Sequence, residues 1–95
     1  MGYQVALSPS ARRDLRDIVR YISLDSPESA VILGQFLVSS TKRLADFPEM
    51  GRVVPEFGDP SLREIVVRSY RVIYRVDHGD CRCPILAWRT RNSRR

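Results

Sequence analysis

The sequence predicts a single α+β domain over residues 1–95, in which an N-terminal helical hairpin packs on one face of a small antiparallel sheet. Two Ser-Pro pairs, Ser8-Pro9 and Ser26-Pro27, each precede a segment with apolar residues at helical spacing. Alternating apolar and polar residues, typical of strands, dominate the second half. Because helices and strands are segregated along the chain, the pattern favours an α+β domain over a parallel sheet.

The first half contains a short strand and two helices. Tyr3–Leu7 alternates weakly and predicts the strand. Ser8 is the expected N-cap of an amphipathic helix that ends near Leu24. The second helix is expected from Ser26-Pro27 to Phe47, since Pro48 pushes the residue before it out of the helical region. The short link makes the two helices antiparallel neighbours.

The second half is expected to be a loop followed by three strands. Glycines and prolines interrupt residues 50–60, and strands are predicted at 62–68, 70–76 and 83–88, with a turn at 77–80. Pro84 predicts that the last strand begins late or lies at an edge. Within 70–76 the tyrosines and valines share the face toward the helices, so Arg71, Ile73 and Arg75 are expected to point toward a partner or solvent.

Charge is distributed unevenly along the chain. Residues 1–60 hold seven basic and eight acidic side chains, whereas residues 61–95 hold nine arginines against Glu64, Asp77 and Asp80. Arginine binds phosphate in a bidentate manner, so a polyanion, above all a nucleic acid, is the expected partner. The alternative is a basic surface that only favours solubility.

Several classes of protein are not expected. No apolar run approaches the roughly 20 residues of a spanning helix and no leader is visible, which predicts a cytoplasmic protein without a membrane partner. Cys81, Cys83 and the nearby His78 are too few and too crowded for a tetrahedral zinc site, so we expect two reduced cysteines, no metal and no cofactor. His78 is expected in a solvated turn, and Trp88 as a packing residue rather than a base-stacking one.

The arginines of the predicted strands and their surroundings are candidates for a nucleic-acid-binding surface. The alternative is a row of exposed arginines paired with Asp and Glu across the sheet. The candidate binding residues are Arg52, Arg63, Arg68, Arg75, Arg94 and Arg95.

Two further residues could carry RNA cleavage, which without a metal needs a base, a cation for the phosphate and an acid for the leaving oxygen. Glu56, in the loop ahead of the basic strands, is the candidate base, and Arg71 is the candidate cation. Neighbouring arginines would lower the pKa of a glutamate and oppose the base role. An ion pair of Glu56 with Arg52 or Arg63 is the alternative.

Four segments resemble RelE/ParE-type toxins of type II toxin–antitoxin systems, and together they cover nearly the whole chain in the same order. They are Leu7–Ile22, with its Asp-Leu and Tyr-Ile pairs; Ser26-Pro27 with Ala30; Phe47–Glu56; and Leu62–Ile65 followed by Tyr70–Val76. The resemblance implies a cognate antitoxin that wraps the toxin with a flexible, often acidic segment. It also implies one of two targets, the ribosome with its messenger RNA or DNA gyrase.

Only some of the catalytic residues known in the family have a match in this sequence. Glu56 matches the catalytic glutamate of YoeB-type members and Arg71 the arginine of their central strand, but the C-terminal His and Tyr of those enzymes are absent. Arg89 or Arg91 would have to stabilise the leaving group instead. A metal-independent, ribosome-dependent messenger-RNA endoribonuclease is therefore the first expectation. A ParE-like gyrase poison without nuclease activity, or an inactive relative that only binds, remains open beside it.

Overall fold

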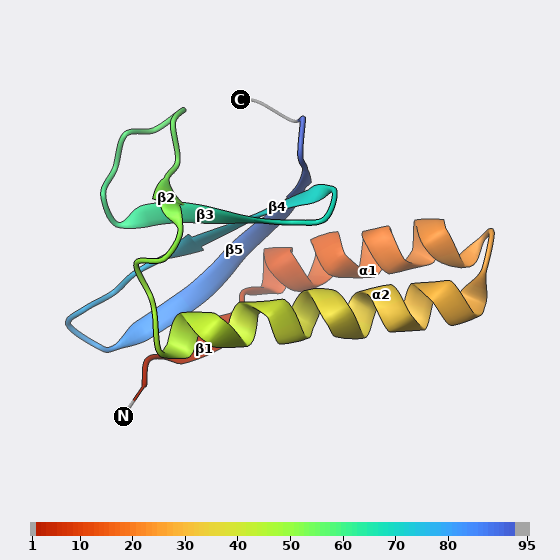
Figure 1. The fold of residues 1–95 in the computed structure, drawn as a ribbon, viewed down its shortest axis with the longest axis horizontal. Coiled ribbons are helices and arrows are strands. Elements are labelled where there is room, and N and C mark those ends of the chain that lie inside the picture. The colour runs from red at the N-terminus through yellow and green to blue at the C-terminus, as the bar shows by residue number, and fades with distance from the viewer. Residues whose placement is uncertain (1, 93–95) are drawn as a thin grey trace.

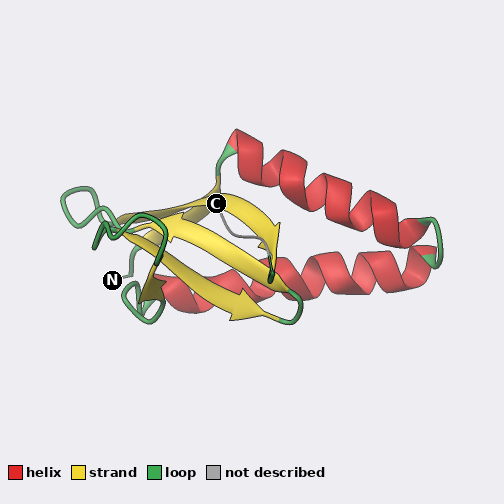
Figure 2. Cartoon of the chain, turned by 90° about the horizontal axis from the view of Figure 1, so that it is seen from above, coloured by secondary structure: helices red, strands yellow, loops and turns green. Residues whose placement is uncertain are grey.

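A computed structural model describes residues 2–92 of the chain as two helices and a short 3₁₀ helix packed with a five-stranded sheet. The helical hairpin lies along one side of the sheet, and the turn between the helices projects beyond the strands (Figures 1 and 2). The α+β class and the position of the hairpin are as predicted from the sequence. Neither helix is long and apolar enough to cross a membrane.

The two α-helices begin where the Ser-Pro pairs predict. Helix α1 spans Pro9–Ser23 and helix α2 spans Pro27–Ser40. The hydroxyl of Ser8 accepts the amide of Ala11, and that of Ser26 accepts the amide of Ser29, so each serine satisfies one of the open amides of a first helical turn.

The second helix does not continue as an α-helix to Phe47. It changes at Thr41 into a 3₁₀ helix, η1, that spans Thr41–Ala45. The hydroxyls of Ser39, Ser40 and Thr41 donate to the carbonyls three residues earlier, at 2.6 to 3.0 Å. Hydroxyl bonds of this kind compete with the helical hydrogen-bond ladder, and three in a row accompany the change to the tighter turn.

The sheet has the order β1-β5-β4-β3-β2. Its strands are β1 (Gln4–Leu7), β2 (Arg52–Val53), β3 (Leu62–Val67), β4 (Tyr70–Arg75) and β5 (Arg82–Thr90). Strands β2 to β5 pair antiparallel, but β1 pairs parallel with β5, so the sheet is mixed rather than wholly antiparallel.

The expectation that Pro84 places the last strand at an edge, or delays its start, is wrong. Strand β5 begins at Arg82 and lies between β1 and β4. The hydrogen-bonded pairing of β4 with β5 ends at the Tyr74–Ile85 pair. Pro84 lies one residue beyond that pair, so its lack of an amide hydrogen costs no hydrogen bond to β4. A register shift after Ile73 leaves Leu86 as an extra residue in β5, and its carbonyl accepts the Ser10 hydroxyl.

One face of the sheet forms the core with the helices. Val72 and Tyr74 of β4 are fully buried among residues from both helices and from β5, including Ala11, Leu37 and Ile85. The phenol of Tyr74 donates to the Pro48 carbonyl at 2.7 Å and accepts the Gly51 amide at 3.0 Å, which fixes the loop after η1. The tyrosine and valine face of β4 therefore meets the helices, as predicted.

Candidate functional site

The face of the sheet opposite the helices carries a hollow of about 350 Å³. Arg71 and Arg75 of β4 alternate with core residues and so share this face with Ile73. Arg89 of β5 lies at its rim, and Glu56 approaches from the loop after β2. The remaining lining is apolar and comes from the same loop and from β3 and β5: Phe57, Leu62, Leu86 and Ala87.

Arg71 is the centre of a buried ion-pair network rather than an exposed cation. Its side chain is 3% exposed, and its Nε donates to Glu64 Oε1 at 2.8 Å. Its Nη2 donates to both carboxylate oxygens of Glu56, at 2.9 and 3.1 Å. The expectation that Arg71 faces away from the helices is confirmed, but of the two surroundings expected there, a partner or solvent, the structure excludes solvent, because carboxylates of the same chain cover the guanidinium.

Glu64 joins this network to β2. Its carboxylate is fully buried, and its second oxygen accepts Arg52 at 2.6 Å. Arg71 pairs with Val66 across the β3–β4 ladder, which makes Glu64 its diagonal neighbour, within reach of a long side chain. Arg52 thus pairs with Glu64, whereas Glu56 pairs with Arg71. The expected ion pair of Glu56 with Arg52 or Arg63 is wrong.

The network holds Arg71 in its charged form. Burial alone would lower the pKa of Arg71, but the hydrogen bonds and charges of Glu64 and then Glu56 outweigh it and raise the pKa above its ordinary value. Arginine keeps its proton in proteins, so it does not act as a general acid toward a leaving group. The guanidinium of Arg71 acts here as a fixed positive charge and a hydrogen-bond donor.

The other two candidate catalytic arginines lie apart from each other. Arg89 is half-exposed at the rim, where it donates to Asp14 at 3.1 Å, and the same Asp14 oxygen accepts the Trp88 amide at 3.0 Å. Arg91 lies outside the hollow, at the end of the β3–β4 hairpin beside Arg68. The structure therefore brings Glu56, Arg71 and Arg89 around one hollow and excludes Arg91 from it.

The candidate nucleic-acid-binding arginines do not form one continuous surface. Arg63 donates to the Gly51 carbonyl at 2.9 Å, and Arg68 lies over the Phe36 ring at 4.3 Å on the helical side. Arg75 donates to Ser61 at 2.8 Å and to Asp59 at 3.4 Å. Arg52 contacts Glu64 as described, while Arg94 and Arg95 lie outside the described residues. Pairing with an acid across the sheet, the alternative, thus accounts for Arg52 and Arg71, while Arg75 pairs with Asp59 of the loop before β3.

Sequence reasoning missed the acids that complete the site. Glu64 and Asp14 resemble ordinary surface carboxylates in the sequence, and only the diagonal position of Glu64 beside Arg71 on the neighbouring strand could have indicated a pair. Trp88 is a buried packing residue and His78 an exposed turn residue, as predicted. His78 also bonds Tyr3 and, at 2.9 Å, Glu49, contacts that the sequence did not indicate.

The chemistry available to the hollow is narrow. Among the described residues that line it, the ionisable side chains are Glu56 and three arginines, without a histidine, tyrosine or lysine. Within residues 2–92, no three side chains of His, Cys, Asp and Glu gather where they could hold a metal ion. The hollow therefore offers positive charge and one carboxylate that is already bound to Arg71.

The fold resembles solved toxin–antitoxin proteins. A chromosomal ParDE system from P. aeruginosa matches with a TM-score of 0.75 and 23% identity, over 93% of this chain and 95% of that one. The intact RelBE complex of E. coli matches with a TM-score of 0.68 and 16% identity, over 98% and 99%. The RelBE2 complex of Mycobacterium tuberculosis matches with a TM-score of 0.66 and 22% identity, over 96% and 100%.

Sequence comparison assigns the family. The search of curated proteins found no match. A family profile described as the ParE toxin of the type II toxin–antitoxin system parDE matches residues 5–92, which is nearly the whole chain. The chain therefore belongs to the ParE toxins of type II toxin–antitoxin systems, within the RelE/ParE superfamily.

Proposed function

We propose that this toxin arrests growth in the cytoplasm by poisoning DNA gyrase, the target implied by its resemblance to ParE-like toxins, and that it does not cut messenger RNA. The observation that carries the proposal is the shielding of Arg71, whose guanidinium is shared between Glu64 and Glu56 and is almost closed to solvent. A phosphate that approached Arg71 would first have to displace a carboxylate.

The state of Glu56 supports the same conclusion. Both of its carboxylate oxygens accept a hydrogen bond from Arg71, so the candidate base is held in an ion pair and is oriented toward Arg71. Among the described residues that line the hollow, the only ionisable side chains besides Glu56 are arginines, and arginine does not release its proton in proteins. A messenger-RNA nuclease would therefore find among them no separate acid for the leaving oxygen.

A nuclease remains the second candidate, and one observation favours it. Glu56 is 17% exposed and lies in the same hollow as Arg75 and Arg89, both of which are about half exposed. If an incoming RNA drew Arg71 away from Glu56, the carboxylate could act on a 2′-hydroxyl beside those two arginines. In that case the charge of Glu56 would be essential for toxicity.

An antitoxin is the expected second partner. Similar solved toxins from P. aeruginosa, E. coli and M. tuberculosis come from ParDE or RelBE systems. The chain carries a net charge of +5, so an acidic, partly flexible antitoxin would complement it. A free antitoxin concentration of a hundred times its dissociation constant would raise the free energy of unfolding of the toxin by roughly 2.7 kcal/mol.

The test is induction of the toxin in a bacterial host, with primer extension on translated messages and gyrase-linked DNA breaks measured in parallel. The proposal expects intact messages and accumulating breaks, and it expects Glu56→Gln to remain toxic. The control variant is Glu28→Gln, which removes an equal charge from the exposed first turn of α2. Translation-dependent cuts in messenger RNA that disappear in Glu56→Gln but not in Glu28→Gln would contradict the gyrase proposal and support the nuclease.

A further inference from the structure

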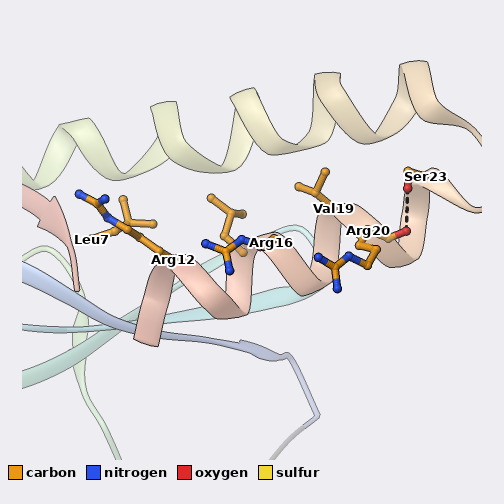
Figure 3. Close-up of a pocket in the computed structure, with 7 residues that line it drawn as sticks. Leu7, Arg12, Arg16, Val19, Arg20 and Ser23 are labelled. Atoms are coloured by element: carbon orange, nitrogen blue, oxygen red, sulfur yellow. Dashed lines mark hydrogen bonds between the residues drawn. The ribbon is translucent and has the colours of Figure 1, made fainter. Parts of the chain in front are cut away.

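Three arginines form a row along α1, and none of them lines the hollow described above. Arg12, Arg16 and Arg20 follow one another at four-residue spacing, and all three are exposed. They line a groove of about 560 Å³ together with Leu7, Leu15 and Val19. Figure 3 shows the three side chains succeeding one another along the helix while Val19 points toward α2.

The row carries charge that the described part of the chain does not neutralise. The arginines around the hollow, Arg71, Arg75 and Arg89, each bond a carboxylate, but no ion pair within residues 2–92 involves Arg12, Arg16 or Arg20. Like charges four residues apart destabilise a helix by about 0.2–0.5 kcal/mol per pair. The first turn of α1 holds no acidic residue, so Arg12 also opposes the helix dipole.

The spacing of the row matches a nucleic-acid backbone. Four residues of α-helix rise about 6 Å, so the row is roughly 12 Å long. One strand of duplex DNA places a phosphate about every 3.4 Å along its axis, and the row therefore spans three to four phosphates. Arginine suits this contact because its planar guanidinium binds phosphate oxygens in pairs.

The groove combines an apolar floor with the three arginines, and it is the arginines that favour a phosphate backbone as the partner. Leu7 and Leu15 are half-buried and already pack against the core, and Val19 lies against Gly34 of α2, where an added Cβ would come within 3.1 Å. The floor of the groove is therefore apolar surface that is only partly used within the fold. The three guanidinium groups add a net charge of +3 along the groove, and this charge is what a phosphate backbone would complement.

We propose that Arg12, Arg16 and Arg20 form a binding strip for the phosphate backbone of duplex DNA. The inference deepens the proposed function, because gyrase is a DNA-bound target and α1 would grip the DNA beside it. The biological role rests on that function, but the binding itself is a property of the toxin alone. A test without gyrase therefore separates the two.

The experiment is fluorescence anisotropy of a labelled 30-base-pair duplex with the purified toxin, titrated from 50 to 200 mM salt. Three phosphate contacts give a log–log salt slope of about −2.7 and a loss of affinity of about 40-fold over that range. The triple variant Arg12→Gln, Arg16→Gln, Arg20→Gln should lose that part of the slope. A matched control, Arg13→Gln, Arg43→Gln, Arg82→Gln, removes the same charge from exposed positions outside the groove.

The two triple variants decide the proposal. A shallow slope for the row variant with a nearly unchanged slope for the control supports the strip, and equal slopes overturn it. Tighter binding of a single-stranded 30-nucleotide RNA would overturn the assignment to duplex DNA. If the row variant kept its DNA affinity and instead lost a co-purified acidic antitoxin, the strip would belong to that partner. Far-UV circular dichroism checks that each variant is folded. The single variant Arg16→Glu, which reverses the central charge of the row, repeats the test with one substitution instead of three.

Discussion

Replacing Arg71 with alanine should destabilise the toxin severely. The change would leave Glu64, whose carboxylate is fully buried, with Arg52 as its remaining partner at 2.6 Å, and would release Glu56 from both of its bonds to Nη2. Removing one partner of a buried ion pair typically costs about 3–5 kcal/mol. Because Arg52 still compensates Glu64 in part, we expect the lower end of that range, about 3 kcal/mol.

The measurement is thermal and urea unfolding followed by circular dichroism. A loss of 3 kcal/mol corresponds to a fall in Tm on the order of 12–24 °C in a domain of this size. The control is Arg75→Ala on the same strand and face, since its pair with Asp59 is half-exposed at both ends and is worth about 0–1 kcal/mol. Adding Glu64→Gln to Arg71→Ala should recover part of the loss, because it removes the buried charge.

A small effect would refute the reasoning. If Arg71→Ala unfolded within about 1 kcal/mol of Arg75→Ala, the network would not be a buried one that stabilises the fold. The same measurement bears on activity, because loss of growth arrest in Arg71→Ala then reports unfolding and not catalysis. Activity experiments should therefore rely on Glu56→Gln.

Three further changes test the packing around the site. Tyr74→Phe leaves the Gly51 amide and the Pro48 carbonyl without their phenol and should cost about 1–3 kcal/mol in urea unfolding. Burial, chiefly, raises the pKa of Tyr74 above 10.0, so wild type should lose stability as the pH rises past about 10, and Tyr74→Phe should lose less over the same alkaline range. Gly51→Ala would place a Cβ 2.5 Å from the Glu64 carbonyl oxygen and should lower the Tm more than Gly79→Ala, where the nearest atom is 3.4 Å away. Ser8→Ala removes the cap of α1 and should lower the free energy of unfolding by about 1 kcal/mol, whereas Ser8→Thr should preserve most of it.

Local patterns in the sequence predicted most of the fold. A serine followed by proline satisfies and shapes a first helical turn by itself, so α1 and α2 begin at the predicted residues. The alternation in β4 likewise follows from strand geometry and correctly separated the core face from the other. The parallel pairing of β1 with β5 joins segments far apart in the chain, and no local pattern specifies such a partner.

The candidate site was predicted less well, for a related reason. The sequence places Glu56, Arg71 and Arg89 in order but does not say which charges neutralise which. Glu64 meets Arg71 only through the register of β3 with β4, and Asp14 meets Arg89 only where α1 packs against β5. Exposure of an arginine depends on such partners, so the burial of Arg71 could not be read from its position in a strand.

The position of β5 has a consequence for how the toxin is made. Of the described strands it is the last to be synthesised, yet it lies inside the sheet, with β1 on one side and β4 on the other. Val5 of β1 can pair with β5 only once Cys83 has been synthesised. Contacts between such distant residues form late because a long loop has to close first. A ribosome that stalls before Arg82 therefore releases a chain whose first strand has no neighbour and whose Asp14 has no Arg89. Assembly of the sheet thus depends on the synthesis of β5, and a chain interrupted before Arg82 cannot bring β1 and β4 together through it.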